Sequence, residues 1–307
     1  MTEREQLRQA RAAYARGENV MELFRTAAGT DRNSVDAVLV SYDLQSGSYR
    51  AALDDADVRA RAARYVGDIV RELDALDFTS MLDAGTGEAT TLMPVLAGLA
   101  SPPERVAAFD LAWSRVAHAR AHARTFPVPA PELFTANLFE IPAADGAFDL
   151  VFTSHALEPN HGREREGLAE LARVSRKWVA LFEPGYELGD DAARRHMETH
   201  GYVRCLRDVA EELGLTVVRH ARLPHSLSPL NPTAVLVLRT SAPDPAPADW
   251  RVCPRCHGPL TTVNGHLFCT GEGLVFPVLD GIPCLSERTA VVASAFDDVR
   301  LGAAVDR

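Results

Sequence analysis

Short apolar runs alternate with longer amphipathic stretches through the middle of this chain. Seven runs have the composition of β-strands, at residues 79–85, 105–110, 133–137, 148–154, 178–184, 216–220 and 234–240. Most of them are continuously apolar, which is typical of strands buried on both faces of a sheet. The stretches between them, such as LMPVLAGLA, are long enough to form helices. The alternation predicts an α/β fold built on an open, mostly parallel, doubly wound sheet.

The parts that flank this region have other patterns. Residues 1–75 carry apolar positions at helical spacing, as in VMELFRTAAG and VRARAARYVGDIVREL, and predict N-terminal helices. The last crossover, 222–233, has three prolines and little helical periodicity, so we expect the last two strands to pair antiparallel. Residues 241–249, SAPDPAPAD, predict a stiff, Pro-rich linker. A small second domain is expected over 250–288, followed by a tail over 289–307.

Composition and charge narrow the class of protein. Apolar residues are 47% of the 307-residue chain and charged residues 24%, a balance that excludes a wholly disordered chain. The net charge of −10 argues against a broad electrostatic contact with nucleic acid. No apolar run approaches the roughly 20 residues of a membrane span, and the charged N-terminus lacks the apolar core of a signal peptide. We therefore expect a cytoplasmic protein without a membrane partner.

The run LDAGTGEATT has the clearest chemistry in the chain. The first strand ends near Asp83, and Gly85 and Gly87 allow a tight turn before a helix expected from Ala89. Glycines let a ligand approach the backbone closely, and a helix N-terminus presents free N–H groups. The second strand ends in Asp110, at the place where a carboxylate can accept both hydroxyls of a ribose. These features predict a nucleotide-like ligand at the carboxyl edge of the sheet.

The next two strands bring further groups to this edge. The third ends near Asn137 and Leu138, an amide and an apolar side chain that could hold a purine ring. The fourth delivers Ser154 and His155. An NAD-binding domain is the alternative, and the missing third glycine of its G-x-G-x-x-G motif counts against it.

Over about residues 78–240 the chain resembles the class I S-adenosylmethionine-dependent methyltransferases. The resemblance rests on LDAGTGEAT, on Asp110, on ANLFEIPAADGAFDLVFTSHALEP and on the antiparallel last strand pair. It implies an α/β fold with a seven-stranded, Rossmann-like methyltransferase sheet. It also implies a methyltransferase domain over 76–240 and an N-terminal helical lid over 1–75.

The resemblance also implies which residues contact S-adenosylmethionine. These are Asp83, Gly85, Thr86, Gly87, Asp110, Leu111, Asn137, Leu138 and Ser154. Carried over by position, the two glycines lie under the methionine part and Asp83 helps to hold its amino group. Asp110 binds the ribose, and Asn137 with Leu138 flanks the adenine.

Polar residues past the fourth and fifth strands are candidates for contact with a methyl acceptor. His155 is the first choice for a general base and Glu158 the second, because both follow the fourth strand. The other expected substrate contacts are Tyr42, Tyr49, Asn160, Glu183, Tyr186 and His200. A carboxylate-rich mouth suits a cationic or hydroxyl-rich small molecule. Any one of these residues could instead serve as a helix cap or surface group.

Four of the five cysteines lie between positions 253 and 284. Cys253 and Cys256 have the spacing of a zinc knuckle and Cys269 begins a second one, where Glu272 stands at the usual place of the fourth cysteine. The fourth ligand is expected to be Glu272, with Cys284, His257 or His266 as alternatives, and a degenerate site without metal is also open.

Residues 250–287 resemble the Trm112-like domains, on CPRCHGPL, LFC and FPVLDGIPCL. The resemblance implies a zinc-ribbon-like fold, some of whose members support methyltransferases as separate subunits.

The fifth cysteine, Cys205, lies apart from this cluster. It stands at an apolar helical position and is expected to be buried and inert.

Together these patterns predict an S-adenosylmethionine-dependent methyltransferase with a structural zinc. The expected acceptor is a small polar molecule such as a sugar, an amino sugar or a specialised metabolite. The alternatives are an RNA-modifying methyltransferase that binds through its C-terminal ribbon, and a non-catalytic scaffold. The acceptor atom and the oligomeric state are left open.

Overall fold

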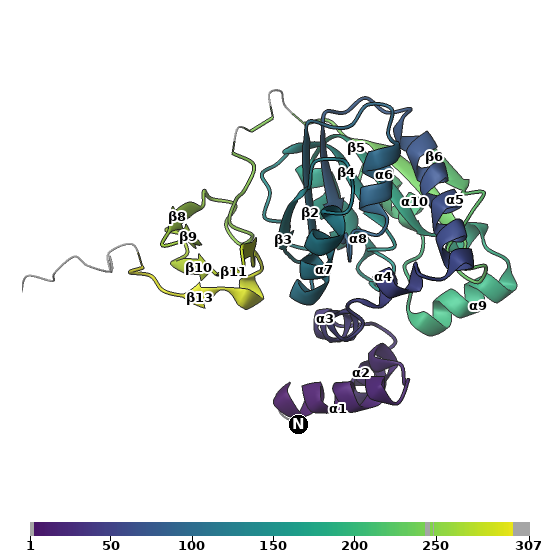
Figure 1. The fold of residues 1–307 in the computed structure, drawn as a ribbon, viewed down its shortest axis with the longest axis horizontal. Helices are drawn as coiled ribbons and strands as arrows, with labels where there is room; N and C mark the ends of the chain where they lie inside the picture. Colours follow the sequence, from purple (N-terminus) through teal and green to yellow (C-terminus); the bar gives the residue numbers. More distant parts are fainter. Residues whose placement is uncertain (1–2, 243–245, 248, 297–307) are drawn as a thin grey trace, which may run out of the picture.

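A seven-stranded sheet forms the centre of the molecule in the computed structural model, which describes residues 3–242, 246–247 and 249–296 (Figure 1). Its strands are β1 (Ser80–Ala84), β2 (Arg105–Asp110), β3 (Glu132–Thr135), β4 (Phe148–Ser154), β5 (Ser175–Pro184), β6 (Thr216–Arg222) and β7 (Thr233–Arg239). They are ordered β3-β2-β1-β4-β5-β7-β6. β7 pairs antiparallel with both β5 and β6, and the pairs formed by β1 to β5 are parallel. The predicted sheet and its antiparallel last pair are confirmed.

Helices cover both faces of this sheet. The helices α5 (Ala56–Leu73), α6 (Leu92–Gly98) and α7 (Trp113–Ala123) share one apolar core with it, and α8 (Glu164–Val174) and α10 (Leu206–Glu212) share the other. Strand residues alternate between these cores, so Met81 packs with the first group and Leu82 with the second. This alternation explains why the strands are apolar along their whole length.

Four N-terminal helices and one later helix lie beyond the carboxyl edge of the sheet (Figure 1). The N-terminal ones are α1 (Glu3–Ala15), α2 (Val20–Ala28), α3 (Val35–Leu44) and α4 (Ser48–Ala52), and we call this segment the lid. The later one is α9 (Asp191–His200), which follows the short helix η1 (Tyr186–Leu188). The expected lid region 1–75 thus has two parts, because α5 packs on the sheet and belongs to its core.

The C-terminal part forms a small separate sheet. Strands β8 (Thr261–Val263), β9 (His266–Cys269), β10 (Leu274–Phe276) and β13 (Val291–Val292) are ordered β13-β10-β9-β8. A hairpin of β11 (Val278–Leu279) and β12 (Ile282–Pro283) precedes the short helix η2 (Glu287–Thr289). The beginning of the expected tail is therefore ordered as β13, whereas residues 297–307 lie outside the described residues.

This C-terminal domain packs against the edge strand β3 (Figure 1). The ring of Trp250 lies 5.6 Å from that of Phe134 and 5.1 Å from that of Phe148, centroid to centroid. The Leu285 N–H donates to the Thr135 carbonyl at 2.7 Å, and Thr135 forms a parallel bridge with Cys284. The contact covers one of the two edges of the large sheet, that of β3. The two domains share one apolar core.

Two local expectations are wrong. The helix after the glycine turn begins at Leu92 and not at Ala89, because Ala89 itself has a positive φ of 57° and extends the turn. Cys205 is exposed and not buried, because it stands at the N-cap of α10 with a left-handed backbone rather than inside the helix.

Within the described residues, no helix combines the length and the apolar character needed to cross a membrane.

The Trp250 contact generates a stability prediction. Trp250→Ala should lower the free energy of unfolding by about 3 to 5 kcal/mol, because a large buried ring leaves a cavity between the domains. Val292→Ala, at a side chain that is 81% exposed, is the matched control and should change it by less than about 0.5 kcal/mol. Urea denaturation followed by fluorescence and circular dichroism measures both. Equal midpoints for the two variants would show that the ring does not join the domains.

Candidate active site

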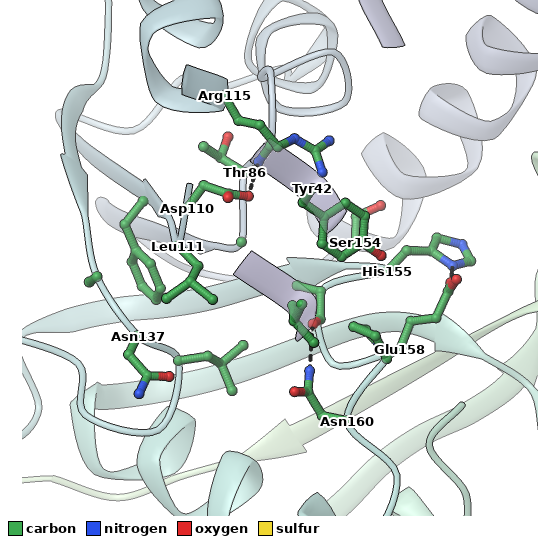
Figure 2. Close-up of a pocket in the computed structure, with 18 of the residues that line it drawn as sticks. Tyr42, Thr86, Asp110, Leu111, Arg115, Asn137, Ser154, His155, Glu158 and Asn160 are labelled. Atoms are coloured by element: carbon green, nitrogen blue, oxygen red, sulfur yellow. Dashed lines mark hydrogen bonds and ion pairs between the residues drawn. The ribbon is translucent and has the colours of Figure 1, made fainter. Parts of the chain in front are cut away.

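A cavity of about 170 Å³ opens at the carboxyl edge of the sheet, beneath the lid (Figure 2). Most of the residues that the sequence predicts for the site line it together: Tyr42, Tyr49, Gly85, Thr86, Gly87, Asp110, Leu111, Asn137, Leu138, Ser154, His155, Glu158 and Asn160. Asp83, Glu183, Tyr186 and His200 do not line this cavity. The roles expected of all these residues stay predictions, and their contacts are described below.

The glycine turn after β1 is tightly enclosed. Gly85 and Gly87 have positive φ angles of 88° and 58°. A Cβ on Gly85 would lie 2.3 Å from the Ala156 Cβ, and one on Gly87 would lie 2.6 Å from Nη2 of Arg115. Any side chain at these two positions would therefore have a strained backbone. At Gly85 it would also push against Ala156, whereas at Gly87 it would have to displace the end of the Arg115 side chain.

Asp110 is held by the backbone around it. Its Oδ2 accepts from the Gly87 N–H at 3.0 Å and its Oδ1 accepts from the Ala112 N–H at 2.9 Å. Each oxygen keeps a second lone pair, and the carboxylate lines the cavity (Figure 2). The arrangement fits a ligand with two neighbouring hydroxyl groups.

Asp83 lies behind the cavity wall and is 3% exposed. Burial, together with the nearby charge of Asp110, raises the pKa of Asp83 to about 7. Among the described residues, no Lys or Arg nitrogen lies within ion-pair distance of this carboxyl group. A bound cation nearby would favour its ionised form.

Asn137 has a more local role than expected. Its Nδ2 donates to Glu140 Oε1 at 2.6 Å, and its Oδ1 accepts from the Phe139 N–H at 3.3 Å. The amide therefore shapes the turn after β3. Leu111, Leu138 and Phe139 supply apolar surface to the cavity beside it.

The partly buried His155 and the buried Glu158 form a pair (Figure 2). Nδ1 of His155 contacts Glu158 Oε2, and Nε2 contacts the Thr233 hydroxyl at 2.9 Å. Burial acts to lower the pKa of His155, but the charge and hydrogen bond of Glu158 raise it above its usual value. Burial acts to raise the pKa of Glu158, but His155, Tyr202 and Asn231 lower it. Because Nδ1 is engaged by Glu158 and Nε2 by Thr233, neither ring nitrogen of His155 is free to act as a base.

Glu183 supports the turn that carries this pair. Its two carboxylate oxygens accept from the N–H groups of Ala156, Leu157 and Glu158 at 3.0, 3.2 and 3.0 Å. The side chain is 2% exposed, and burial raises the pKa of Glu183 to about 7. It positions the 155–158 segment and does not reach the cavity. Tyr186 is also engaged elsewhere, since its hydroxyl donates to Glu198 Oε1 at 2.6 Å.

Sequence reasoning missed two residues that join the lid to the cavity. Glu88 is fully buried, and its two oxygens accept from the N–H groups of Gly47 and Arg50 at 2.8 and 2.9 Å. Arg115 of α7 places its guanidinium 4.9 Å from the ring centre of Tyr42 and 4.4 Å from that of Tyr49. Glu88 directly follows the glycine turn, which was the available signal, but its partners are some forty residues away in the chain.

The C-terminal domain holds a second candidate site. The Sγ atoms of Cys253, Cys256 and Cys269 lie within 4.8 Å of one another. Backbone hydrogen bonding from Gly258 lowers the pKa of Cys256. Glu272 is paired with Arg255 Nε at 3.1 Å, and it is not part of the three-thiol group. Three sulfur ligands fit zinc and leave one coordination position for another donor.

Two family models match the chain. A methyltransferase domain matches residues 81–177, and a Trm112p-like protein matches residues 252–281. A UPF0434 protein of Azotobacter vinelandii is 45% identical over 49 residues, which are 15% of this chain and 80% of the relative. A UPF0434 protein of Laribacter hongkongensis is also 45% identical over 49 residues, 15% of this chain and 83% of the relative. The C-terminal segment thus belongs to the UPF0434, Trm112p-like family.

The chain is a methyltransferase with a Trm112p-like C-terminal domain. Magnesium protoporphyrin IX methyltransferase of Synechocystis PCC 6803, solved with bound SAH, has a similar fold, with a TM-score of 0.52 and 18% identity, covering 65% of this chain and 98% of that one. A chain from the complex between the Haloferax volcanii Trm112 methyltransferase activator and the putative methyltransferase gives a TM-score of 0.50 and 14% identity over 63% of this chain and 95% of that one. Both likenesses bear on the fold of this methyltransferase alone.

The Glu88 contacts predict that the lid depends on this carboxylate. Glu88→Gln leaves one of the two lid N–H groups without its charged acceptor, so the Gly47 and Arg50 amides should exchange with solvent about tenfold faster. Hydrogen exchange followed by mass spectrometry measures this. Glu212→Gln, at an exposed ion pair with Arg165, is the control and should leave lid exchange unchanged. Unchanged exchange in Glu88→Gln would mean that other contacts hold the lid.

Proposed function

We propose that this methyltransferase transfers the methyl group of S-adenosylmethionine to a small polar molecule that binds beneath the lid. The observation that carries the proposal is a second cavity, of about 270 Å³, between the lid and the turn after β4. It shares Tyr42, Tyr49, Glu158 and Pro159 with the first cavity, so the two meet at these residues. We call it the acceptor chamber. Its volume suits a small molecule rather than a folded nucleic acid.

The residues of the first cavity suit S-adenosylmethionine. When bound, this cofactor supplies a methyl group that its sulfonium makes electrophilic. Asp110 can accept the two ribose hydroxyls, and the glycine turn leaves room for close approach of the backbone. Leu111, Leu138 and Phe139 offer apolar surface to the adenine. Asp83, buried without a cationic partner among the described residues, suits a nearby ammonium group.

The chain's own part in the transfer is to position and to exclude water. An in-line displacement needs the acceptor on the far side of the methyl group, at contact distance and with water excluded. Tyr42 and Tyr49 stand where the two cavities meet, and the lid that carries them is tied to the glycine turn through Glu88. Glu158 is the residue we assign to contact with the acceptor, with His155 positioning it.

The Trm112p-like domain has a supporting role in this proposal. The Haloferax volcanii Trm112 protein is described as a methyltransferase activator. Here the domain lies in the same chain and covers β3, whose carboxyl end leads to Asn137 and Leu138. We infer that it holds that side of the cofactor cavity, and that Cys253, Cys256 and Cys269 bind a structural zinc ion with Glu272 or another donor completing the site.

The cofactor assignment is tested by Asp110→Ala. The variant should bind S-adenosylmethionine about a hundredfold more weakly, because the acceptor of both ribose hydroxyls is removed. Isothermal calorimetry on the full chain gives the affinity, and Asp145→Ala, an exposed aspartate paired with Arg173, is the control. Equal affinities for the two variants would remove the ribose assignment.

The acceptor class is tested with labelled cofactor. The protein is incubated separately with metabolite, RNA and protein fractions, and the metabolite fraction should become labelled. Label in RNA alone would overturn the small-molecule proposal.

The zinc assignment predicts about one zinc ion per chain in protein purified without chelators. Cys256→Ser should lose most of this zinc because it removes one of three thiolates. Cys205→Ser changes an exposed cysteine outside the cluster and should retain it. Elemental analysis by mass spectrometry measures all three proteins. A wild-type chain without metal would refute the assignment.

A further inference from the structure

The acceptor chamber has an unusually aromatic lining. Tyr14, Tyr42, Tyr49, Tyr202 and His200 all line it. Two of these rings contact a cation in the first cavity. The Arg115 guanidinium lies 4.9 Å from the ring centre of Tyr42 and 4.4 Å from that of Tyr49. The faces of tyrosine rings carry partial negative charge and attract cations. The lining therefore favours a positively charged ligand over an anionic one.

Glu158 adds a buried carboxylate to this lining. The contacts of His155 and Asn231 both go to its Oε2, and Tyr202 also hydrogen-bonds to the carboxylate. Since each carboxylate oxygen has two lone pairs, Oε1 can accept from a donor in the chamber. His155 lines the cofactor cavity but not the acceptor chamber. A ligand in the chamber thus meets the carboxylate first, and His155 lies on the other side of it.

Arg25 also lines the chamber, but neighbouring oxygen atoms of the protein already accept hydrogen bonds from its guanidinium. Its Nη1 donates to Asn33 Oδ1 at 2.7 Å and to the His200 carbonyl at 3.3 Å, and its Nη2 donates to the Thr199 carbonyl at 3.2 Å. These two carbonyls end α9, where the helix dipole is negative. Arg25 therefore fastens the lid to the end of α9 and does not need an anionic ligand.

The polar groups beside the chamber also limit the chemistry of the acceptor. A hydroxyl acceptor must lose its proton as it attacks, which requires a base with a free lone pair. Both nitrogens of His155 are engaged, and the carboxylate of Glu158 is a weak base for the proton of an ordinary alcohol. A neutral amine carries its own lone pair and needs no such base. A carboxylate or phosphate acceptor would be repelled by Glu158.

We propose that the acceptor chamber binds a small amine, with its nitrogen between Glu158 and the tyrosine rings, and that this nitrogen is the atom methylated. This inference rests on the proposed methyl transfer from S-adenosylmethionine and names its substrate class. The amine binds as an ammonium and loses one proton to solvent. Its lone pair then forms the new N–C bond as the S–C bond breaks, and the sulfur keeps that electron pair. The product is again an ammonium, with the charge that the sulfonium has lost.

The first test separates charge recognition from catalysis. Choline and 3,3-dimethylbutan-1-ol have nearly the same shape and differ in charge, so they probe the chamber of the full chain in the presence of S-adenosylhomocysteine. Choline should bind about threefold to thirtyfold more tightly than the neutral probe. Calorimetry measures both, and cofactor affinity is measured in the same preparation. Equal affinity of the two probes, or no binding of choline by a chain that binds cofactor, would overturn the amine inference and leave the proposed function standing.

Variants test which side chains produce the preference for choline. Glu158→Gln should abolish the preference for choline, whereas Glu164→Gln should retain it. Glu164 is the matched control because it is equally buried and is paired with His161 three residues before it, but lines neither cavity. Tyr202→Phe keeps the ring and should retain most of the preference, and Tyr202→Leu should lose about threefold or more of it.

The second test asks which atom is methylated. Phenethylamine and 2-phenylethanol are offered separately with labelled cofactor, and label should appear in the amine alone. Label in the alcohol and not in the amine would overturn the inference while supporting methyl transfer. Failure of S-adenosylmethionine to bind at all would instead count against the proposed function, so the two failures are distinguishable.

Discussion

The close approach of two turns at the carboxyl edge of the sheet is the constraint on which the site depends. Gly85, after β1, lies so near Ala156, after β4, that a Cβ would stand 2.3 Å from the alanine methyl. Glu183, from β5, accepts the N–H groups of residues 156–158 and holds the second turn in place. Three strands therefore converge on one small volume. Residues of both turns line the first cavity, and Glu158 lines the acceptor chamber as well.

The lid and the C-terminal domain both attach around this junction. The lid is connected through Glu88 beside the glycine turn, through Arg115 beneath Tyr42 and Tyr49, and through Arg25 at the end of α9. The C-terminal domain is connected through Trp250 and through the bridge of Cys284 to Thr135. Since β3 runs on into the turn of Asn137, a contact made for stability on the outer edge also bears on the shape of the cavity.

The pair of His155 and Glu158 shows how the neighbours of a site residue in the fold limit the role that its type suggests. Read from the chain, His155 has the residue type and the position of a general base. In the fold both of its nitrogens are engaged, one by Glu158 and one by Thr233 of β7. Thr233 lies 78 residues further along the chain, so no local sequence pattern predicts the contact. The histidine therefore positions the carboxylate, and Glu158 becomes the group that a ligand would meet.

Much of the fold could be predicted from the sequence, because strands buried on both faces must be apolar and crossovers must be helical. The prolines of 222–233 were enough to predict the antiparallel last pair, and the LDAGTGEATT run indicated the edge of the sheet where the first cavity lies. These features are local, since each depends on a few neighbouring residues. The tertiary structure alone decided that Glu183 supports a turn, that Cys205 is exposed, that α5 packs on the sheet and that Glu88 and Arg115 hold the lid. Those outcomes depend on hydrogen bonds, ion pairs and packing between residues far apart in the chain. Such residues come into contact only when the chain folds, so local sequence patterns do not predict their contacts.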